Sequence, residues 1–150
     1  MKVIAAGNSF CGDDGVGAAV LDAIRERNIL PGVDLVDVQT DALALVELLE
    51  PQEPAIVVDA ARMGAAPGSV AVLRPDEESL GLRGDHLSLH GLGLPEALAL
   101  ARRLGRLPAR LVVIGVEPGR LDLGGGLSEA VRAAVPQVVD IIAAEVGAHG

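Results

Sequence analysis

The chain alternates short aliphatic runs with segments of helical periodicity, and this alternation constrains its fold more than any other feature. Runs that are rich in β-branched residues and bounded by Gly, Pro or Asp predict strands. The predicted strands are Lys2–Ala6, Val33–Val38, Ala55–Asp59, Ser69–Leu73 and Leu111–Val116. Strands that alternate with helices require right-handed crossovers. We therefore predict an α/β fold, a three-layer α/β/α sandwich around a mostly parallel, twisted sheet of about five strands.

Helical spacing of apolar residues predicts the intervening elements. The predicted helices are Asp14–Arg27, Ala42–Leu49, Pro95–Leu104 and Ser128–Val146. Asp41 is placed to cap the second of them through its side chain. Pro136 lies inside the last one, which predicts a kink or two short helices there.

Composition narrows the class of protein. Half of the 150 residues are apolar but only one is aromatic, so the core must consist of Leu, Val, Ile and Ala. No repeat or linker divides the chain, and we expect a single domain over residues 1–150. The formal net charge of −9 and the lack of a basic stripe argue against nucleic-acid binding. The arginines Arg102, Arg103 and Arg106 are interpreted as the solvated end of a helix.

The single cysteine and the hydropathy pattern indicate where in the cell the protein is expected to be. Cys11 excludes an internal disulfide and a cysteine-based zinc site, and we interpret it as a small buried residue. No apolar run approaches the roughly 20 residues that a membrane span needs. The sequence begins directly with a predicted strand, without a signal-peptide pattern. We expect a cytoplasmic protein that does not enter a membrane.

Three polar residues follow predicted strands or precede a predicted helix. Ligands of open α/β sheets bind beyond the carboxyl ends of the strands, where the sequence places Asp14, Asp59 and His90. Two carboxylates and an imidazole suit Zn, Ni or Mn, with a position left open for water or substrate. His86 is a competing histidine, but Gly84 and Ser88 disfavour a helix-borne pair with His90.

Each candidate also has a purely structural interpretation. Asp13 or Asp14 could cap the first helix, Asp59 could form a turn, and His90 could be a helix cap or a surface residue. The stretch "GNSFCGDDGVG" lacks the spacing of a phosphate-binding loop, and its aspartates would repel a phosphate. The residues alone therefore predict an α/β domain with a candidate metal or acid–base site.

Six motifs in order add a family resemblance. They are "GNSFCGDDGVG" at Gly7–Gly17, "VVDA" at Val57–Ala60, "GAAPGSV" at Gly64–Val70, "SLHGLGLPEAL" at Ser88–Leu98, "VIGVEP" at Val113–Pro118 and "GLS" at Gly126–Ser128. This series resembles the hydrogenase maturation proteases, endopeptidases that trim the C-terminus of the large subunit of [NiFe] hydrogenases. The chain departs from the family after the second predicted strand, where Val38-Gln39-Thr40 replaces the usual Gly-Gly-Thr or Gly-Gly-Ser.

The resemblance implies a role for each candidate residue. Asp14 and Asp59 would take the two acidic metal-binding positions and His90 the family's histidine, and these three would also be the catalytic residues. The metal would be nickel, held by the large-subunit precursor rather than kept permanently by the protease. Asp13 would cap and orient the loop, and Gly12 and Gly15 would let the backbone turn so that Asp14 faces the cleft.

The resemblance thus implies a protease that acts on a nickel-loaded precursor. We expect a monomer, because no sustained apolar face is left over once the core is assigned. Water could be activated by either Asp14 or Asp59, since no Ser-His-Asp order or H-E-x-x-H motif is present. Two other functions stay open at this point. One is a nickel-binding chaperone without catalytic activity, and the other is a small-molecule hydrolase on the same fold.

Overall fold

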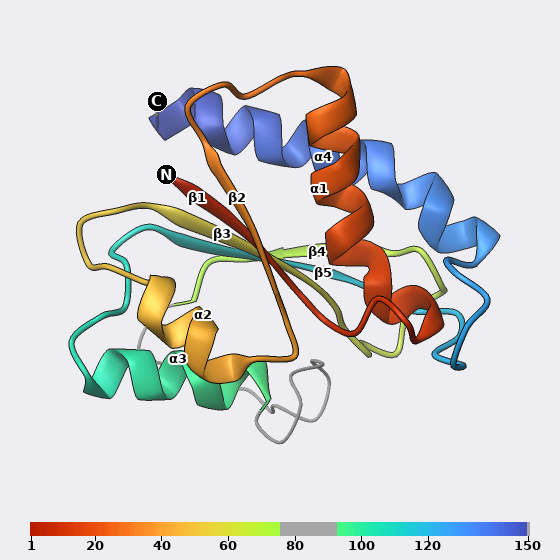
Figure 1. Ribbon diagram of the computed structural model, residues 1–150, viewed down its shortest axis with the longest axis horizontal. Coiled ribbons are helices and arrows are strands. Elements are labelled where there is room, and N and C mark those ends of the chain that lie inside the picture. The colour runs from red at the N-terminus through yellow and green to blue at the C-terminus, as the bar shows by residue number, and fades with distance from the viewer. Residues whose placement is uncertain (76–92, 150) are drawn as a thin grey trace.

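The sheet has five strands in the order β2-β1-β3-β5-β4 (Figure 1). The computed structural model describes residues 1–75 and 93–149. The strands are β1 (Lys2–Ala6), β2 (Asp34–Gln39), β3 (Ala55–Ala60), β4 (Val70–Leu73) and β5 (Leu111–Val116). All neighbours pair in parallel except β4, which runs antiparallel to β5 at one edge. The predicted fold class is confirmed, and each strand lies within one residue of its predicted bounds.

Helices cover both faces of the sheet. They are the 3-10 helix η1 (Gly12–Gly15), α1 (Val16–Arg27), α2 (Ala42–Leu48), α3 (Leu94–Arg103) and α4 (Glu129–His149). Helices α1 and α4 lie on one face, and α2 and α3 lie on the other (Figure 1). Among the described residues, no helix is both long enough and apolar enough to cross a membrane.

Two aliphatic cores hold these layers together. On one face, Val20 and Ile24 of α1 and Ile142 of α4 pack in one cluster with Val58 of β3. On the other face, Leu45 and Val46 of α2 and Leu94 and Leu98 of α3 pack in one cluster with Val57 of β3. Each fully buried aliphatic side chain of this size contributes about 1.5–3 kcal/mol. Successive residues of β3 serve opposite cores, which is why its run is apolar throughout.

Two helix predictions need correction. The segment from Asp14 was expected to be α-helical, but Gly12–Gly15 forms a separate 3-10 turn and the α-helix begins at Val16. Pro136 was expected to kink the last helix or divide it into two short ones; α4 is one continuous helix through it, so the division is wrong. A proline removes one backbone donor. Buried Val135 and Val138 on either side of Pro136 anchor the helix to the sheet, and this packing offsets the loss.

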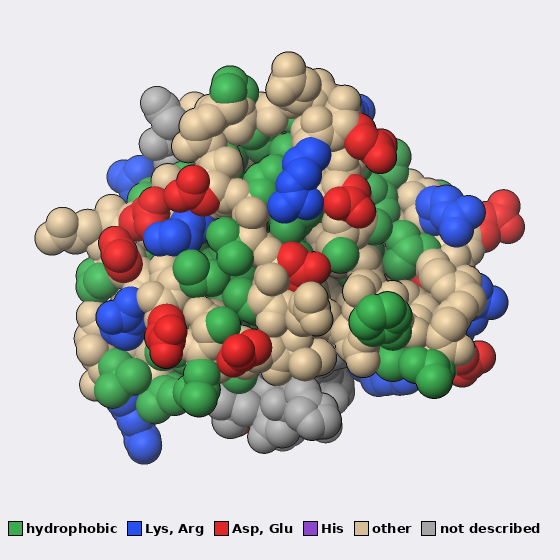
Figure 2. Space-filling model, in the orientation of Figure 1, with side chains coloured by type: hydrophobic (Ala, Val, Ile, Leu, Met, Phe, Trp, Pro, Cys, Tyr) green, Lys and Arg blue, Asp and Glu red, His purple; other side chains and the backbone are tan. Residues whose placement is uncertain are grey.

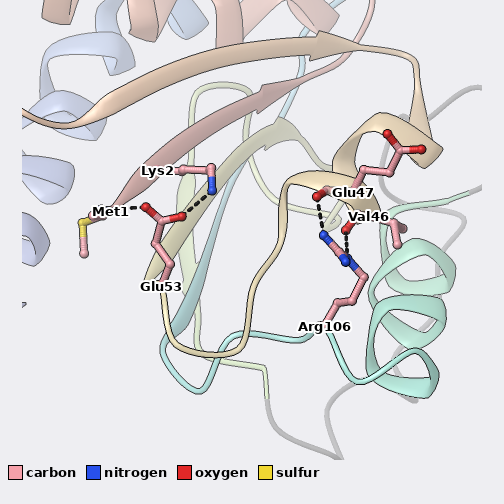
Figure 3. A network of polar contacts seen from close by, with 6 residues as sticks. All are labelled: Met1, Lys2, Val46, Glu47, Glu53 and Arg106. Carbon is pink, nitrogen blue, oxygen red and sulfur yellow. Dashed lines mark hydrogen bonds and ion pairs between the residues drawn. The ribbon is translucent and has the colours of Figure 1, made fainter.

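Polar contacts at the helix ends explain two further sequence features. The Asp41 carboxylate accepts a hydrogen bond from the Ala44 amide at 3.0 Å, so its predicted capping of α2 is confirmed. Arg106 was assigned to the solvated end of α3, but that helix ends at Arg103. The Arg106 guanidinium instead donates to the carbonyl oxygens of Val46 and Glu47 near the C-terminus of α2 (Figure 3). The Val46 carbonyl also accepts from the Leu49 amide at the end of α2, so Arg106 adds a second donor there and supplies a donor to Glu47.

Candidate active site

The site lies where β1 and β3 end. Both strands run in parallel, so the residues after β1 and the last residues of β3 meet at one edge of the sheet. Gly7 follows β1 directly with φ +120°, a backbone conformation that favours glycine. A Cβ built on Gly7 would lie 3.2 Å from Asp59 Oδ1 and 3.3 Å from Asp14 Oδ1. The two oxygens are therefore no farther apart than the sum of these distances, and the predicted pairing of Asp14 with Asp59 is present.

One oxygen of the Asp14 carboxylate accepts a hydrogen bond, and the other has no hydrogen-bond partner among the described residues. The residue is 8% exposed and lies in η1. Its Oδ2 accepts a hydrogen bond from the Asn8 amide at 2.7 Å. Its Oδ1 is buried and accepts no hydrogen bond from any residue that the structure describes. Since buried carboxylate oxygens normally have a hydrogen-bond partner, Oδ1 is a candidate position for a ligand contact.

Asp59 is placed by the pleat of β3. It is fully buried and pairs with Gly115 across the sheet. Side chains two residues apart point to the same face of a strand. Val57 packs against the α2 and α3 core, so Asp59 projects on that same side of the sheet, just before the strand ends.

Asp13 has a role that differs from that of its neighbour. Its carboxylate is fully buried and accepts hydrogen bonds from the amides of Gly119 (2.7 Å), Arg120 (2.9 Å) and Ser128 (2.6 Å) and from the Ser128 hydroxyl (2.7 Å). Burial alone would raise the pKa of Asp13, but the hydrogen bonds from Ser128, Arg120 and Gly119 together outweigh it and lower the pKa. We call this set of contacts the Asp13 clasp, because it ties η1 to the loop between β5 and α4.

The clasp confirms part of what was expected of Asp13. The residue orients the loop, as predicted. Neither η1 nor α1 has a side-chain hydrogen bond at its N-cap, so the alternative in which Asp13 or Asp14 caps the first helix is wrong. Gly12 has φ +54°, and a Cβ there would lie 2.7 Å from the Arg120 carbonyl oxygen, so glycine is needed for this close approach. Gly15 has an ordinary φ of −85°, but a Cβ there would lie 3.1 Å from the Ser9 Cα, so glycine is favoured at this position by close approach alone.

Glu117 is a buried carboxylate that the sequence analysis did not single out. It is 6% exposed and follows β5. Its Oε1 accepts hydrogen bonds from the amides of Met63 (2.6 Å) and Ala65 (3.1 Å), so it fixes the loop that leaves β3 just after Asp59. The only sequence signal was its place in the "VIGVEP" motif, directly after a strand that ends at the same edge as β1 and β3.

The remaining predicted site residues have different outcomes. His90 and His86 lie outside the described residues. Within residues 1–75 and 93–149, no group of three or more His, Cys, Asp or Glu side chains could hold a metal ion. Cys11 was expected to be buried, but it is partly exposed, because its backbone bridges to Leu123 and Gly124 at the rim of the site.

Comparison with known proteins gives a consistent family. The family model described as hydrogenase maturation protease matches residues 18–145, a range that includes Asp59 and His90 and begins four residues after Asp14. The hydrogenase expression/formation protein HupM of Azotobacter chroococcum mcd 1 is 35% identical over 150 residues, which are 99% of this chain and 72% of that protein. The hydrogenase 2 maturation protease of Escherichia coli K12 is 32% identical over 145 residues, 95% of this chain and 88% of that protein.

Solved structures agree with the sequence matches. The hydrogenase maturating endopeptidase HybD from E. coli superposes with a TM-score of 0.86 at 30% identity, covering 100% of this chain and 94% of that one. The hydrogenase 2 maturation peptidase from Thaumarchaeota archaeon SCGC_AB-539-E09 superposes with a TM-score of 0.74 at 29% identity, with 97% of each chain covered. The whole described fold is therefore shared with these endopeptidases.

Proposed function

This chain belongs to the hydrogenase maturation protease family, and we propose that it removes the C-terminal extension of a [NiFe] hydrogenase large-subunit precursor after nickel has been inserted. In this proposal the nickel belongs to the substrate, and the protease recognises it. The protein would act in the cytoplasm as a monomer. The names of its relatives and structural neighbours support the endopeptidase activity and its place in hydrogenase maturation.

The buried Asp14 Oδ1, which accepts no hydrogen bond from the described residues, is the observation that supports the site most directly. Asp14 and Asp59 bring two carboxylates next to one backbone position, Gly7, at the edge where ligands of parallel sheets bind. A divalent cation is the kind of ligand that two converging carboxylates hold, because it offsets their mutual repulsion.

His90 is proposed as the third contact to the nickel. The described chain resumes at Gly93, and α3 begins at Leu94, whose side chain belongs to the core on the face toward which Asp59 projects. Three peptide units separate His90 from Gly93 and can span at most about 11 Å. A carboxylate and imidazole set suits nickel, since both are ligands that this metal accepts.

The peptide bond would be cleaved by water. A carboxylate, either Asp14 or Asp59, would take a proton as the water oxygen bonds to the carbonyl carbon. The C–N bond would then break as the leaving nitrogen takes up a proton. Contact with the substrate's nickel would fix the extension so that one bond lies at the carboxylates, and such orientation alone can be worth roughly 7–11 kcal/mol of the barrier.

The proposal is tested by the intact mass of a [NiFe] hydrogenase large-subunit precursor after incubation with the protein, with nickel-loaded and nickel-free precursors side by side. Loss of a C-terminal peptide from the loaded form alone is the expected result. Asp14→Ala, Asp59→Ala and His90→Ala should each slow processing about 10²-fold or more. Asp22→Ala, at a side chain that is 68% exposed on α1, is the matched control and should process normally.

Three outcomes would contradict the proposal in different ways. A folded Asp14→Ala variant with full activity would remove the site from the mechanism. Binding of the loaded precursor without any change in its mass would favour the chaperone. A response to small metabolites, with neither binding nor cleavage of the precursor, would favour a small-molecule hydrolase.

A further inference from the structure

The only aromatic side chain of this protein is on the surface beside the candidate site. Phe10 is 72% exposed, and the chain has no Trp or Tyr. Leu123, which is 83% exposed, lies in the loop between β5 and α4. Fully exposing a Phe ring forfeits about 1.5–3 kcal/mol of burial. Two large apolar side chains exposed on loops that are joined beside a candidate site form a candidate interaction surface.

Hydrogen bonds fix the backbone that carries this ring. The Phe10 amide donates to Asn8 Oδ1 at 2.9 Å, and the Phe10 carbonyl accepts from the Gly124 amide at 2.7 Å. The Asn8 amide in turn donates to Asp14 Oδ2. The backbone at Phe10 is therefore connected to the candidate catalytic carboxylate through a single residue, so the exposed ring starts from a fixed position relative to the site.

The two apolar residues come from different loops that are joined at several points. Cys11 forms backbone bridges with Leu123 and Gly124, and the Asp13 clasp ties the same two loops together. Figure 2 shows hydrophobic side chains gathered over the loop between β1 and α1 and over the loop that precedes α4. We call the pair Phe10 and Leu123 the apolar rim.

We propose that the apolar rim binds an apolar side chain of the C-terminal extension of the precursor and so positions the scissile bond at Asp14 and Asp59. This inference rests on the proposed function. The Phe10 amide donates to the Asn8 side chain and the Asn8 amide donates to Asp14, so the rim adjoins the carboxylates at which the extension would be cleaved. Aromatic residues are enriched among the side chains that dominate binding energy in interfaces.

A second copy of this chain is a poorer occupant for the same surface. The formal net charge is −9, and two copies would bring like charges together. Self-association alone would also not require the backbone of Phe10 to be linked, through Asn8, to the Asp14 carboxylate. The extension of the precursor accounts for both the exposure of the ring and its connection to the site.

The test measures both affinity for the nickel-loaded precursor and its rate of processing. Phe10→Ala should weaken binding about tenfold, with a matching fall in kcat/KM. Phe10→Leu should restore most of the loss. Leu104→Ala is the matched control, because Leu104 is also exposed (59%) but lies at the C-terminal end of α3, away from the strands' carboxyl edge. Thermal unfolding midpoints of all three variants should match that of the unmodified protein.

A second substrate identifies the segment that is bound. Replacing the apolar residues of the extension by serine should weaken binding to the unmodified protein but change binding to Phe10→Ala little, because the contact is already lost. Equal losses in both proteins would overturn the assignment to the extension. Equal affinities of Phe10→Ala and Leu104→Ala for the original precursor would overturn the binding role of the rim. So would self-association that Phe10→Ala abolishes while its affinity for the precursor stays unchanged. Failure of the unmodified protein to process any loaded precursor would instead overturn the proposed function, and the rim with it.

Discussion

Replacing Asp13 by asparagine tests whether the Asp13 clasp holds the active-site loop. The carboxylate accepts four hydrogen bonds, three from backbone amides and one from a hydroxyl. An asparagine side chain offers only one oxygen, and its NH₂ group must face a donor. In the less costly orientation, the asparagine oxygen takes the place of Asp13 Oδ2 and accepts from the amides of Gly119 and Arg120 and from the Ser128 hydroxyl. The NH₂ group then takes the place of Oδ1 and faces the Ser128 amide, which is left without an acceptor.

The cost can be worked out from these contacts. A buried amide left without an acceptor costs about 1–3 kcal/mol. The three bonds that remain lose their charge assistance, which roughly halves their strength. Together we expect Asp13→Asn to lower the free energy of unfolding by about 2–4 kcal/mol, a large part of the 5–15 kcal/mol that is typical of a domain. Urea unfolding at pH 7, followed by far-ultraviolet circular dichroism, measures this directly.

The pH dependence of the same variant gives an independent check. Since its pKa is lowered in the folded protein, Asp13 stabilises the fold above the unfolded pKa of about 3.9. That contribution is lost as the pH falls through the folded pKa. The deficit of Asp13→Asn should therefore be complete at pH 7 and shrink below about pH 4. Glu53 also has a lowered pKa, mainly because of its hydrogen bond with Lys2, and so adds its own pH dependence to the stability. Comparing each variant with the unmodified protein at the same pH removes this contribution from the difference.

The matched control is Asp22→Asn on the exposed face of α1. Within the described part of the chain, the polar partner of Asp22 is Arg25, at 3.3 Å. Exposed ion pairs of this kind contribute about 0–1 kcal/mol. Its unfolding free energy should stay close to that of the unmodified protein. The reasoning on the clasp is refuted if Asp13→Asn costs no more than Asp22→Asn at pH 7, or if its deficit is the same at pH 7 and pH 3.

Two further substitutions test the backbone of the site and the end of α2. Gly7→Ala should lower the free energy of unfolding in urea by several kcal/mol, because its Cβ would lie 2.2 Å from the Asp14 carbonyl oxygen. The control Gly64→Ala, also at positive φ but with no atom within 4 Å of its Cβ, should cost only about 1–2 kcal/mol. Equal costs would contradict the close packing at Gly7. Arg106→Ala should cost about 1–2 kcal/mol and speed amide hydrogen exchange in α2, because the carbonyls of Val46 and Glu47 each lose the guanidinium as a donor (Figure 3). Arg103→Ala should do neither.

The strands were predictable because their pattern is local and unambiguous. Each is a short β-branched run between turn residues, and a buried parallel strand needs little else. The 3-10 turn at Gly12–Gly15 was missed, because four residues are too few to show a period. The continuity of α4 through Pro136 was missed for another reason. Local rules describe the cost of the proline, whereas the packing that offsets it comes from the sheet.

The candidate site was only partly predictable. Asp14 and Asp59 could be brought together from sequence, since parallel strands end at one edge, and the structure confirms that they face one point beside Gly7. The hydrogen bonds to Asp13 span 106 to 115 residues of sequence, so no local pattern could show them. The same limit applies to Glu117, whose partners lie 52 and 54 residues away.

The two adjacent aspartates show how one short stretch divides structural and chemical work. Both are buried in the same turn, so burial alone cannot distinguish them. Both oxygens of Asp13 are occupied by donors from the loop between β5 and α4, and a carboxylate in that state has little left to offer a substrate. Asp14 uses one oxygen for its own loop and keeps the other turned toward the point it shares with Asp59. The chain thus uses its first aspartate to fix the turn that carries the second, whose Oδ1 accepts no hydrogen bond from the described residues.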